Sequence, residues 1–321
     1  MEVYRYDELD RAPRGSVVAI GFFDGVHLAH KALLAKARNK ASDYSAPFGV
    51  FTFTSESGIK EGAKRLYDTE TRLFQIGYFK PSFIVLVDFD DIRELLPEEF
   101  VRDVLIEKLG VKAVAVGENF RFGKGASGSA DDLIRLMNEA GAEVIIEQMQ
   151  ERDGFTVSSS LIRRLIEEGN IKQANRLLVT GYRCHATVVR GNGEGRGLGF
   201  PTVNCKPNGL SPKRGVYYTG VKIDGETYYA LTNVGTCPTL GEREPHLETH
   251  ILGYCGDAYG KEIVIYFYDF IRDEIKFDSK EALVEQVKKD IETVRLAGEE
   301  NDRAMNEVEK MINKIRRENQ D

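Results

Sequence analysis

The chain has 321 residues, 42% of them hydrophobic and 30% charged, which is the composition of a globular protein long enough for two domains. Its formal net charge of −7, from 44 basic and 51 acidic residues, argues against a nucleic-acid partner, because such binders usually carry a basic surplus. The N-terminus has no secretory pattern and no apolar run is long enough to cross a bilayer. We therefore expect a cytoplasmic protein without a membrane partner.

The first half alternates short apolar runs with amphipathic stretches, which predicts a Rossmann-like parallel sheet with helices on both faces. The expected strands are Val17–Phe23, Phe48–Phe53, Phe83–Val87, Lys112–Val116 and Glu143–Ile146, and the expected helices are Leu28–Ala41, Thr69–Phe79, Glu98–Leu109 and Asp131–Ala140. Sheets of this kind bind ligands beyond the carboxyl ends of their strands.

The pattern changes after residue 158, and we expect a domain boundary near residue 180. Two short helices, Ser159–Glu168 and Ile171–Leu178, precede a strand-rich region. Its expected strands are Tyr182–Val189, Val216–Ile223, Glu226–Leu231, His246–Leu252 and Glu262–Tyr268, with a tight hairpin at Asp224-Gly225. Several strands without intervening helices predict a small antiparallel barrel or a sandwich.

Helical patterns close the sequence. Asp278-Ser-Lys-Glu281 resembles a capping box and predicts a helix that places Leu283, Val287, Ile291 and Val294 on one face. A second helical run is expected beyond Ala297-Gly298. The four cysteines, Cys184, Cys205, Cys237 and Cys255, are widely spaced, which disfavours a structural zinc site and predicts free thiols.

A strand-to-helix turn in the first half reads Gly21-Phe-Phe-Asp-Gly-Val-His-Leu-Ala-His30. Gly21 and Gly25 allow a sharp turn, and His27 and His30 fall on one face of the first helical turn. Together with the free N–H groups of a helix start, the two imidazoles favour binding of a polyphosphate and nucleotidyl transfer. The alternative is a pair of surface histidines, which the position directly after a buried strand disfavours.

Two further segments carry polar side chains toward the same edge of the predicted sheet. Asn119 and Arg121 follow another expected strand. Ser158-Ser-Ser-Leu-Ile-Arg163 offers three hydroxyls and a guanidinium at a helix start, where they suit phosphate. One of these serines is also expected to cap the helix.

A glycine-dense loop in the second half reads Gly195-Arg-Gly-Leu-Gly-Phe-Pro-Thr-Val-Asn204. Its glycines predict a loop that can surround an anion, and the proline fixes the exit from it. Thr202 and Asn204 offer the hard oxygen donors that a magnesium–nucleotide complex prefers. The alternative is a glycine-rich barrel loop that binds no ligand. Two phosphate-binding devices in one chain indicate two reactions on nucleotides.

These segments, in this order, resemble the prokaryotic bifunctional riboflavin kinase/FMN adenylyltransferase (FAD synthetase) family over essentially residues 1–297. The resemblance implies a Rossmann-like nucleotidyltransferase domain (1–180), a small antiparallel β-barrel riboflavin kinase domain (181–297) and a helical extension (298–321). It implies an enzyme that phosphorylates riboflavin to FMN with Mg-ATP and then adenylylates FMN to FAD, releasing pyrophosphate.

The family motifs also imply roles for individual residues. In the first domain His27, His30 and Asn119 would be catalytic, and the ATP site would comprise Gly21, Phe22, Asp24, Gly25, His27, His30, Arg121, Ser158, Ser159, Ser160 and Arg163. In the second domain Glu248 would be the catalytic base. Its ATP site would comprise Gly195, Gly197, Gly199, Pro201, Thr202 and Asn204, with Thr202 and Asn204 as Mg²⁺ ligands. Asn233 and Arg272 would contact the flavin, whereas His185, His246 and His250 are expected at the surface.

The chain departs from the family pattern at three places. Ala29 replaces the glycine between the two histidines, Thr52-Phe-Thr-Ser-Glu-Ser57 replaces Pro-His-Pro, and Cys237 replaces a frequent arginine. Two alternatives therefore stay open: an active kinase with a weak or inactive adenylyltransferase, and a non-catalytic flavin-binding or regulatory protein. The tail after residue 297 is expected either to pack on the kinase domain or to mediate weak self-association.

Overall fold

The computed structural model describes residues 2–54, 64–191, 194–207, 209–236 and 245–318, and beyond residue 303 only the backbone. The chain divides into two compact units: Met1–Leu165 with Ala174–Thr180, and Ile166–Gln173 with Gly181–Asp321. The division into functional domains at residue 180 stays a prediction. Within the described parts, no helix combines the length and apolar content needed to cross a bilayer.

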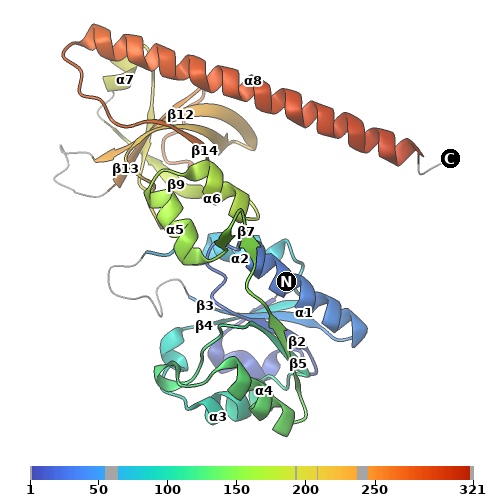
Figure 1. Cartoon of the computed structure of the whole chain (residues 1–321). Coiled ribbons are helices and arrows are strands. Elements are labelled where there is room, and N and C mark those ends of the chain that lie inside the picture. Colours follow the sequence, from blue (N-terminus) through green and yellow to red (C-terminus); the bar gives the residue numbers. More distant parts are fainter. Residues whose placement is uncertain (1, 55–63, 192–193, 208, 237–244, 319–321) are drawn as a thin grey trace. The chain divides into compact units, whose positions relative to one another are not determined.

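The first unit contains a six-stranded parallel sheet in the order β1-β4-β3-β2-β5-β6 (Figure 1). Its strands are β1 (Glu2–Tyr4), β2 (Val17–Ile20), β3 (Phe48–Phe53), β4 (Phe83–Val87), β5 (Ala113–Gly117) and β6 (Glu143–Glu147). The five predicted strands and the Rossmann-like architecture are confirmed. The edge strand β1 is too short to show a period in the sequence.

Helices cover both faces of this sheet. Successive residues of a strand point to opposite faces, so the apolar residues of one strand contribute to two clusters. On one face Leu34 and Ala37 of α1 (Leu28–Asp43) pack with Val17 and Ala19 of β2. On the other, Val18 and Ile20 join a cluster with residues of η3 (Phe100–Lys108) and α4 (Ala130–Glu139). The helices and the small hairpin are η1 (Tyr6–Arg11), α1 (Leu28–Asp43), α2 (Thr69–Gly77), η2 (Phe89–Asp91), α3 (Pro97–Glu99), η3 (Phe100–Lys108), η4 (Lys124–Ala126), α4 (Ala130–Glu139), β7 (Glu151–Arg152), β8 (Phe155–Thr156), α5 (Ser159–Glu167) and α6 (Ile171–Leu177).

The stretch expected as a helix over Glu98–Leu109 winds differently from the prediction. A single turn, α3, leads into the nine-residue π-helix η3, which ends with a bond from the Leu109 N–H to the Val104 carbonyl. The buried residues Phe100, Val101, Val104 and Leu105 lie on one face in either winding. Their spacing therefore predicts a helix without distinguishing its hydrogen-bond register.

The second unit is a closed antiparallel barrel in the order β10-β13-β12-β11-β14-β9, which confirms the barrel rather than the sandwich. The strands are β9 (Arg183–Val189), β10 (Val203–Cys205), β11 (Gly215–Ile223), β12 (Glu226–Thr236), β13 (Pro245–Ile251) and β14 (Glu262–Arg272). The described interior includes Tyr217, Phe267 and three fully buried threonines. Thr232 lies 2.8 Å from Thr219 and 3.0 Å from Thr249, hydroxyl to hydroxyl, so these polar groups satisfy one another.

One long helix, α8 (Lys280–Glu318), follows the barrel, and a short helix, α7 (Glu194–Gly197), lies in the glycine-rich loop (Figure 1). Ser279 rather than Asp278 caps α8, because its Oγ accepts from the Ala282 N–H at 3.1 Å. The expected break at Gly298 was wrong. The Tyr229 ring packs on Gly298 so closely that an added Cβ would lie 2.7 Å from it. This glycine permits close packing within a continuous helix instead of ending it.

Candidate active sites

The first unit has a cavity of about 320 Å³ at the carboxyl ends of β2 and β5. The strand order reverses here, because β2 lies between β3 and β5. Parallel sheets bind ligands at this topological switch point. The cavity is lined by Ile20, Gly21, Phe23, His27, Ala29, His30, Leu33, Gly117, Glu118, Asn119, Phe120, Glu147, Gln148, Met149, Val157, Ser158, Ser159 and Ser160.

The turn between β2 and α1 has a strained backbone. Phe23 and Val26 have φ values of 51° and 36°, which bulky residues rarely adopt, and Gly25 has a φ of 89°. Surrounding packing holds this conformation, since a Cβ at Gly25 would lie 2.6 Å from the Leu66 side chain. Strain that packing maintains is typical of functional sites.

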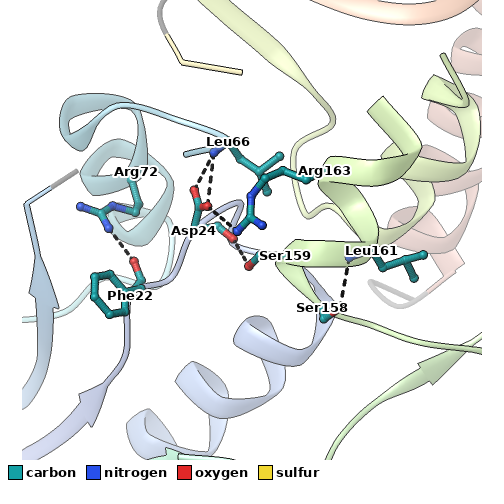
Figure 2. A network of polar contacts seen from close by, with 8 residues as sticks. All are labelled: Phe22, Asp24, Leu66, Arg72, Ser158, Ser159, Leu161 and Arg163. Carbon is teal, nitrogen blue, oxygen red and sulfur yellow. Dashed lines mark hydrogen bonds and ion pairs between the residues drawn. The ribbon is translucent and has the colours of Figure 1, made fainter. Parts of the chain in front are cut away.

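Asp24 connects this turn to two other segments, as Figure 2 shows. Its carboxylate, 2% exposed, accepts from the Leu66 N–H at 3.0 Å and pairs with Arg163 at 3.4 Å. The Ser159 hydroxyl donates to the Asp24 carbonyl at 2.7 Å. Asp24 and Gly25 therefore shape the turn without lining the cavity. The buried Asp24 carboxylate holds the Arg163 side chain beside this turn.

A buried arginine supports the same turn from the other side. Arg72, which is fully buried, donates to the Phe22 carbonyl at 2.7 Å (Figure 2). It also donates to the Phe53 carbonyl. The guanidinium of Arg65 lies 4.3 Å from the centre of the Phe22 ring. Phe22 is thus fixed at both its backbone and its side chain, but it does not line the cavity either.

The two predicted histidines are stacked on each other, with ring centres 3.7 Å apart and planes inclined by 15°. Burial lowers the pKa of His27 to about 4, and burial, the neighbouring His27 and Arg72 lower the pKa of His30 well below its usual value. Both rings are therefore neutral at pH 7. His27 Nδ1 accepts from the His30 N–H at 3.4 Å and caps α1, so the His27 proton lies on Nε2.

The other predicted residues of this site divide between lining and supporting positions. Ser158 caps α5 by accepting from the Leu161 N–H at 3.2 Å, and Ser160 is exposed at the cavity wall. Asn119 also lines the cavity and contacts the Met149 sulfur at 3.7 Å. Arg121 lies apart, exposed and donating to the Ala126 carbonyl at 3.2 Å.

The second unit has a cavity of about 300 Å³ on the outer face of the barrel, beside α8. The strand register places Asn204, Glu248, Asn233, Val216 and Arg272 in one row across β10, β13, β12, β11 and β14. Side chains of directly paired residues share a face. This row therefore brings together the predicted base, both predicted flavin contacts and a predicted Mg²⁺ ligand. All of its members except Asn204 line the cavity.

The glycine-rich loop closes over this row. The Phe200 N–H donates to the Gly195 carbonyl at 2.8 Å, and a Cβ on Gly195 would lie 2.5 Å from the Phe200 carbonyl oxygen. Gly199 has a φ of 86°, which favours glycine. Gly195, Phe200 and Thr202 line the cavity, whereas Gly197 lies outside its wall and is exposed.

A third cavity, of about 490 Å³, lies on the other side of Thr202. Its wall includes Pro201, Thr202 and the loop Tyr254–Tyr259 between β13 and β14. The sequence does not predict that this loop belongs to a site, although Tyr254 and Tyr259 at its two ends have aromatic rings of the kind that stack on nucleobases. Asp224 holds the loop from the side, because it accepts from Tyr254 at 3.0 Å and pairs with Lys261 at 2.6 Å.

Two histidines that the sequence places at the surface lie in this region. His246 is 8% exposed, and its Nε2 lies 2.8 Å from the Asn204 Oδ1. His250 lines the second cavity, with its Nδ1 2.8 Å from the Pro201 carbonyl. The surface prediction is wrong for His246, because its side chain packs against Asn204 at the end of the glycine-rich loop, whereas His250 is half-buried. His185 is half-buried on β9.

Arg272 is occupied by an ion pair within the unit. Its Nε and Nη2 donate to the Asp290 carboxylate at 3.0 and 2.6 Å, and its Nη1 donates to the Asp273 carbonyl at 3.0 Å. Asp290 lies on α8 and is buried. Leu283, Val287 and Asp290 of α8 line the cavity. The sequence predicts the apolar face of this helix. The spacing of the apolar residues does not indicate that this face forms a wall of a cavity.

The donor set suits magnesium better than a soft metal ion. Thr202 lines the cavity together with the exposed carboxylate of Glu248. Asn204 lines neither cavity of the barrel, but it pairs with Glu248 across β10 and β13. Oxygen atoms are the ligands that Mg²⁺ prefers, completed by phosphates and water. Among the described residues no group of three or more His, Cys, Asp or Glu side chains is arranged to hold a metal ion.

Comparison with known proteins assigns each unit to a family. Residues 9–161 match the FAD synthetase model, and residues 178–297 match the riboflavin kinase model. A bifunctional riboflavin kinase/FMN adenylyltransferase of Listeria monocytogenes is 34% identical over 87% of this chain and 91% of its own length. The protein of that name from Escherichia coli is 32% identical over 89% of this chain and 94% of its own length.

A crystal structure described as that of a macrolide-efflux protein from Streptococcus pneumoniae is also similar. It has a TM-score of 0.83 and 30% sequence identity, over 92% of this chain and 99% of that chain. The two family matches in this order, the strand order of each unit and the relatives that extend over most of the chain agree with one another. This chain belongs to the bifunctional riboflavin kinase/FMN adenylyltransferase family.

Proposed function

We propose that this chain carries out two consecutive reactions at two separate sites. The barrel unit phosphorylates riboflavin to FMN, and the parallel-sheet unit adenylylates FMN to FAD. The observation that carries the assignment is the row of Asn204, Glu248 and Asn233 beneath the glycine-rich loop, together with the stacked histidines at the switch point of the sheet. A kinase alone or a non-catalytic flavin binder is not favoured, because both enzymatic families match this one chain.

In the kinase reaction Glu248 acts as general base. Its exposed carboxylate takes the proton from the 5′-hydroxyl of riboflavin, the hydroxyl oxygen attacks the γ-phosphate of ATP, and ADP leaves. The isoalloxazine ring would lie in the cavity between the barrel and α8, whose wall includes Val216, Leu231 and Val287. Asn233 and Arg272 are its proposed polar neighbours, with Arg272 held in place by Asp290.

The third cavity is the proposed nucleotide site of the kinase. Thr202 lies in the walls of both cavities, so phosphates beside it would reach the row that contains Glu248. Tyr254 and Tyr259 provide rings for an adenine base. Thr202 and Asn204 would hold magnesium, which when bound neutralises phosphate charge. Gly195, Gly197 and Gly199 allow the loop to approach the phosphates closely.

In the adenylyltransferase reaction a phosphate oxygen of FMN attacks the α-phosphate of ATP, and pyrophosphate leaves. The protein contributes fixed donors rather than a nucleophile. His27 offers Nε2–H because its Nδ1 caps α1, and His30 adjoins it in the same cavity wall. The free N–H groups at the start of α1, Ser160 and Asn119 are further donors. Arg163 is paired with the buried Asp24 carboxylate beside the same turn.

The substitutions in this half bear on its rate. Ala29 lines the cavity with both histidines, so its methyl group occupies space beside the proposed phosphate position. Thr52 is fully buried and donates to the Phe22 carbonyl at 3.2 Å. Ser55, Glu56 and Ser57 of the divergent segment lie outside the described residues, as does Cys237. We infer an active but slow adenylyltransferase.

The remaining assignments follow from these reactions. The protein acts in the cytoplasm, where ATP and flavins occur, and its partners are small molecules rather than nucleic acid or membrane. Residues 298–302 pack on the barrel, since Tyr229 donates to the Gly298 carbonyl at 3.2 Å and Asn301 donates to Tyr218 at 3.0 Å. Weak self-association through the rest of the tail is a further proposal.

The experiment that tests the function incubates the purified chain with riboflavin and Mg-ATP and separates the flavins by chromatography over time. The proposal predicts that FMN appears first and FAD follows more slowly. FMN without FAD would establish the kinase alone. Formation of neither, in a sample that binds riboflavin, would favour a non-catalytic flavin binder.

A further inference from the structure

The amide of Asn204 is enclosed between two residues to which the proposed function gives no role. Its Oδ1 lies 2.8 Å from Nε2 of His246, and both side chains are 8% exposed. On the opposite side the amide packs directly on Gly191, where an added Cβ would overlap it. An exposed asparagine amide samples many orientations, because its terminal torsion is broad. The enclosure by His246 and Gly191 restricts that torsion.

The position of His246 on β13 places its contact with Asn204 next to the row that contains Glu248. His246 and Glu248 are two residues apart on β13, so their side chains lie on the same face of the strand. Asn204 pairs directly with Glu248 across β10 and β13. The strand β13 therefore carries both the proposed base and the histidine that contacts the Asn204 amide.

We propose that His246 is a positioning residue for the kinase reaction, whose Nε2–H donates to Asn204 Oδ1 and fixes the amide for the magnesium–nucleotide complex. An amide oxygen has two lone pairs, so one accepts from His246 while the other stays available to a cation. Residues that hold a metal ligand by a hydrogen bond orient that ligand. The proposal rests on the kinase activity proposed above and adds a residue that acts through Asn204.

The test compares His246→Leu, His246→Gln and, as a control on another strand of the same barrel, His185→Leu. Loss of an orienting partner typically costs 10–100-fold in metal affinity or activity, so we expect the KM for Mg-ATP in His246→Leu to rise by about 10–100-fold. The KM for riboflavin should stay within about twofold. His246→Gln, whose Nε2 can donate to Asn204, should recover most of the loss, and His185→Leu should behave as the unaltered chain.

Calorimetry supplies a readout that does not depend on turnover. ADP binding is measured with and without Mg²⁺, and His246→Leu should weaken only the binding that requires Mg²⁺. FAD formation from FMN in the same samples should be unchanged, which shows that the first unit is intact. Should His246→Leu fail to fold, His246→Asn replaces it, because its shorter amide does not reach Asn204.

A double-variant cycle separates positioning from a structural role. If His246 acts through Asn204, His246→Leu should have little further effect in a chain that already carries Asn204→Ala. An equal loss in both backgrounds, or an equal weakening of riboflavin binding and metal-free ADP binding, would overturn the proposal. Failure of the unaltered chain to make FMN or to bind Mg-ADP would instead overturn the kinase assignment itself.

Discussion

At the scale of single residues, the two proposed sites differ in chemistry. The proposed adenylyltransferase site offers neutral donors, since burial keeps His27 and His30 uncharged at pH 7. The proposed kinase site has an exposed carboxylate, Glu248, in its cavity wall as the proposed base. This contrast is what the two reactions require, because a primary alcohol must lose a proton to attack a phosphate, whereas the phosphate of FMN is already an anion.

Replacement of Glu248 tests the base directly. Glu248→Gln keeps the size of the side chain but cannot accept a proton, so FMN formation should fall by roughly 10²–10⁴-fold. The rate is measured with riboflavin and Mg-ATP at saturation. FAD formation from added FMN is the internal control and should not change. Near-normal turnover of riboflavin would exclude Glu248 as the base.

The acid titration of His27 is a second test. Its folded-state pKa of about 4 lies below the ordinary value of 6.5, so the unfolded chain binds a proton first as the pH falls. The stabilisation is complete above about pH 6.5 and is lost progressively toward pH 4, by at most about 1.36 kcal/mol per pH unit for this group.

Histidine-selective NMR of the ligand-free protein, which has five histidines, measures this pKa. His27→Asn identifies the resonance and retains a side chain that can cap α1. The unfolding midpoint of the first unit should depend less on pH between 4 and 6.5 in this variant. A His27 resonance that titrates near pH 6.5 would contradict the neutral, buried donor described here.

Ala29 offers a gain-of-function test. Ala29→Gly removes the methyl group from the cavity wall and should raise the rate of FAD formation from FMN, provided that the methyl crowds the phosphates. Riboflavin phosphorylation serves as the control and should stay constant. An unchanged FAD rate would mean that the backbone already accommodates alanine, and that the substitution is neutral.

At the scale of elements, an ion pair joins β14 to α8 beside the cavity that we propose for the flavin. Removal of Arg272 would leave the buried Asp290 carboxylate without its charged partner, which typically costs about 3–5 kcal/mol. We expect Arg272→Ala to lower the unfolding free energy of the barrel unit by about this amount, as measured by denaturant titration.

The double variant Arg272→Met/Asp290→Leu separates the structural from the binding role of this arginine. Apolar replacement of both partners should restore most of the stability. If Arg272 also contacts the flavin, riboflavin affinity should stay low in the double variant. Full recovery of both quantities would show that Arg272 serves only to hold α8.

Helices and strands are predicted well from the sequence where the apolar residues recur regularly or a capping residue is present. They are predicted less well where contacts with distant segments determine where an element ends. The strands around Val17, Phe83 and Ala113 are buried on both faces and appear as continuous apolar runs. Gly298 shows the limit: a glycine followed by charged residues predicts a helix end, but the ring of Tyr229, far away in sequence, uses the absence of a Cβ for close packing.

The candidate sites show the same limit. Residues within a continuous motif, such as His27 with His30 or Thr202 with Asn204, could be named from the sequence. The contact of His246 with Asn204 depends on the register between β10 and β13, and the ion pair of Asp290 with Arg272 depends on how α8 packs on the barrel. Neither follows from local sequence, because both contacts join segments that are distant along the chain.

At the scale of the whole molecule, we expect the two proposed sites to work independently in one chain. Each cavity is built within a single unit, with its own glycines, donors and packing. FMN released by the barrel site can therefore be used by the adenylyltransferase site of any molecule in solution. The two activities should be separable by single substitutions and recoverable by mixing.

Mixing two singly altered chains is the most direct measurement. Glu248→Gln should make FAD from FMN but not from riboflavin, and His30→Ala should convert riboflavin only to FMN, since loss of one fixed donor typically costs about 10²–10³ in rate. An equimolar mixture, supplied with riboflavin and Mg-ATP, should form FAD, because each chain contributes the site that the other lacks. A mixture that stops at FMN or leaves riboflavin untouched, although each chain retains its own single activity, would contradict independent sites. Loss of both activities in either single variant would contradict the assignment of one reaction to each unit.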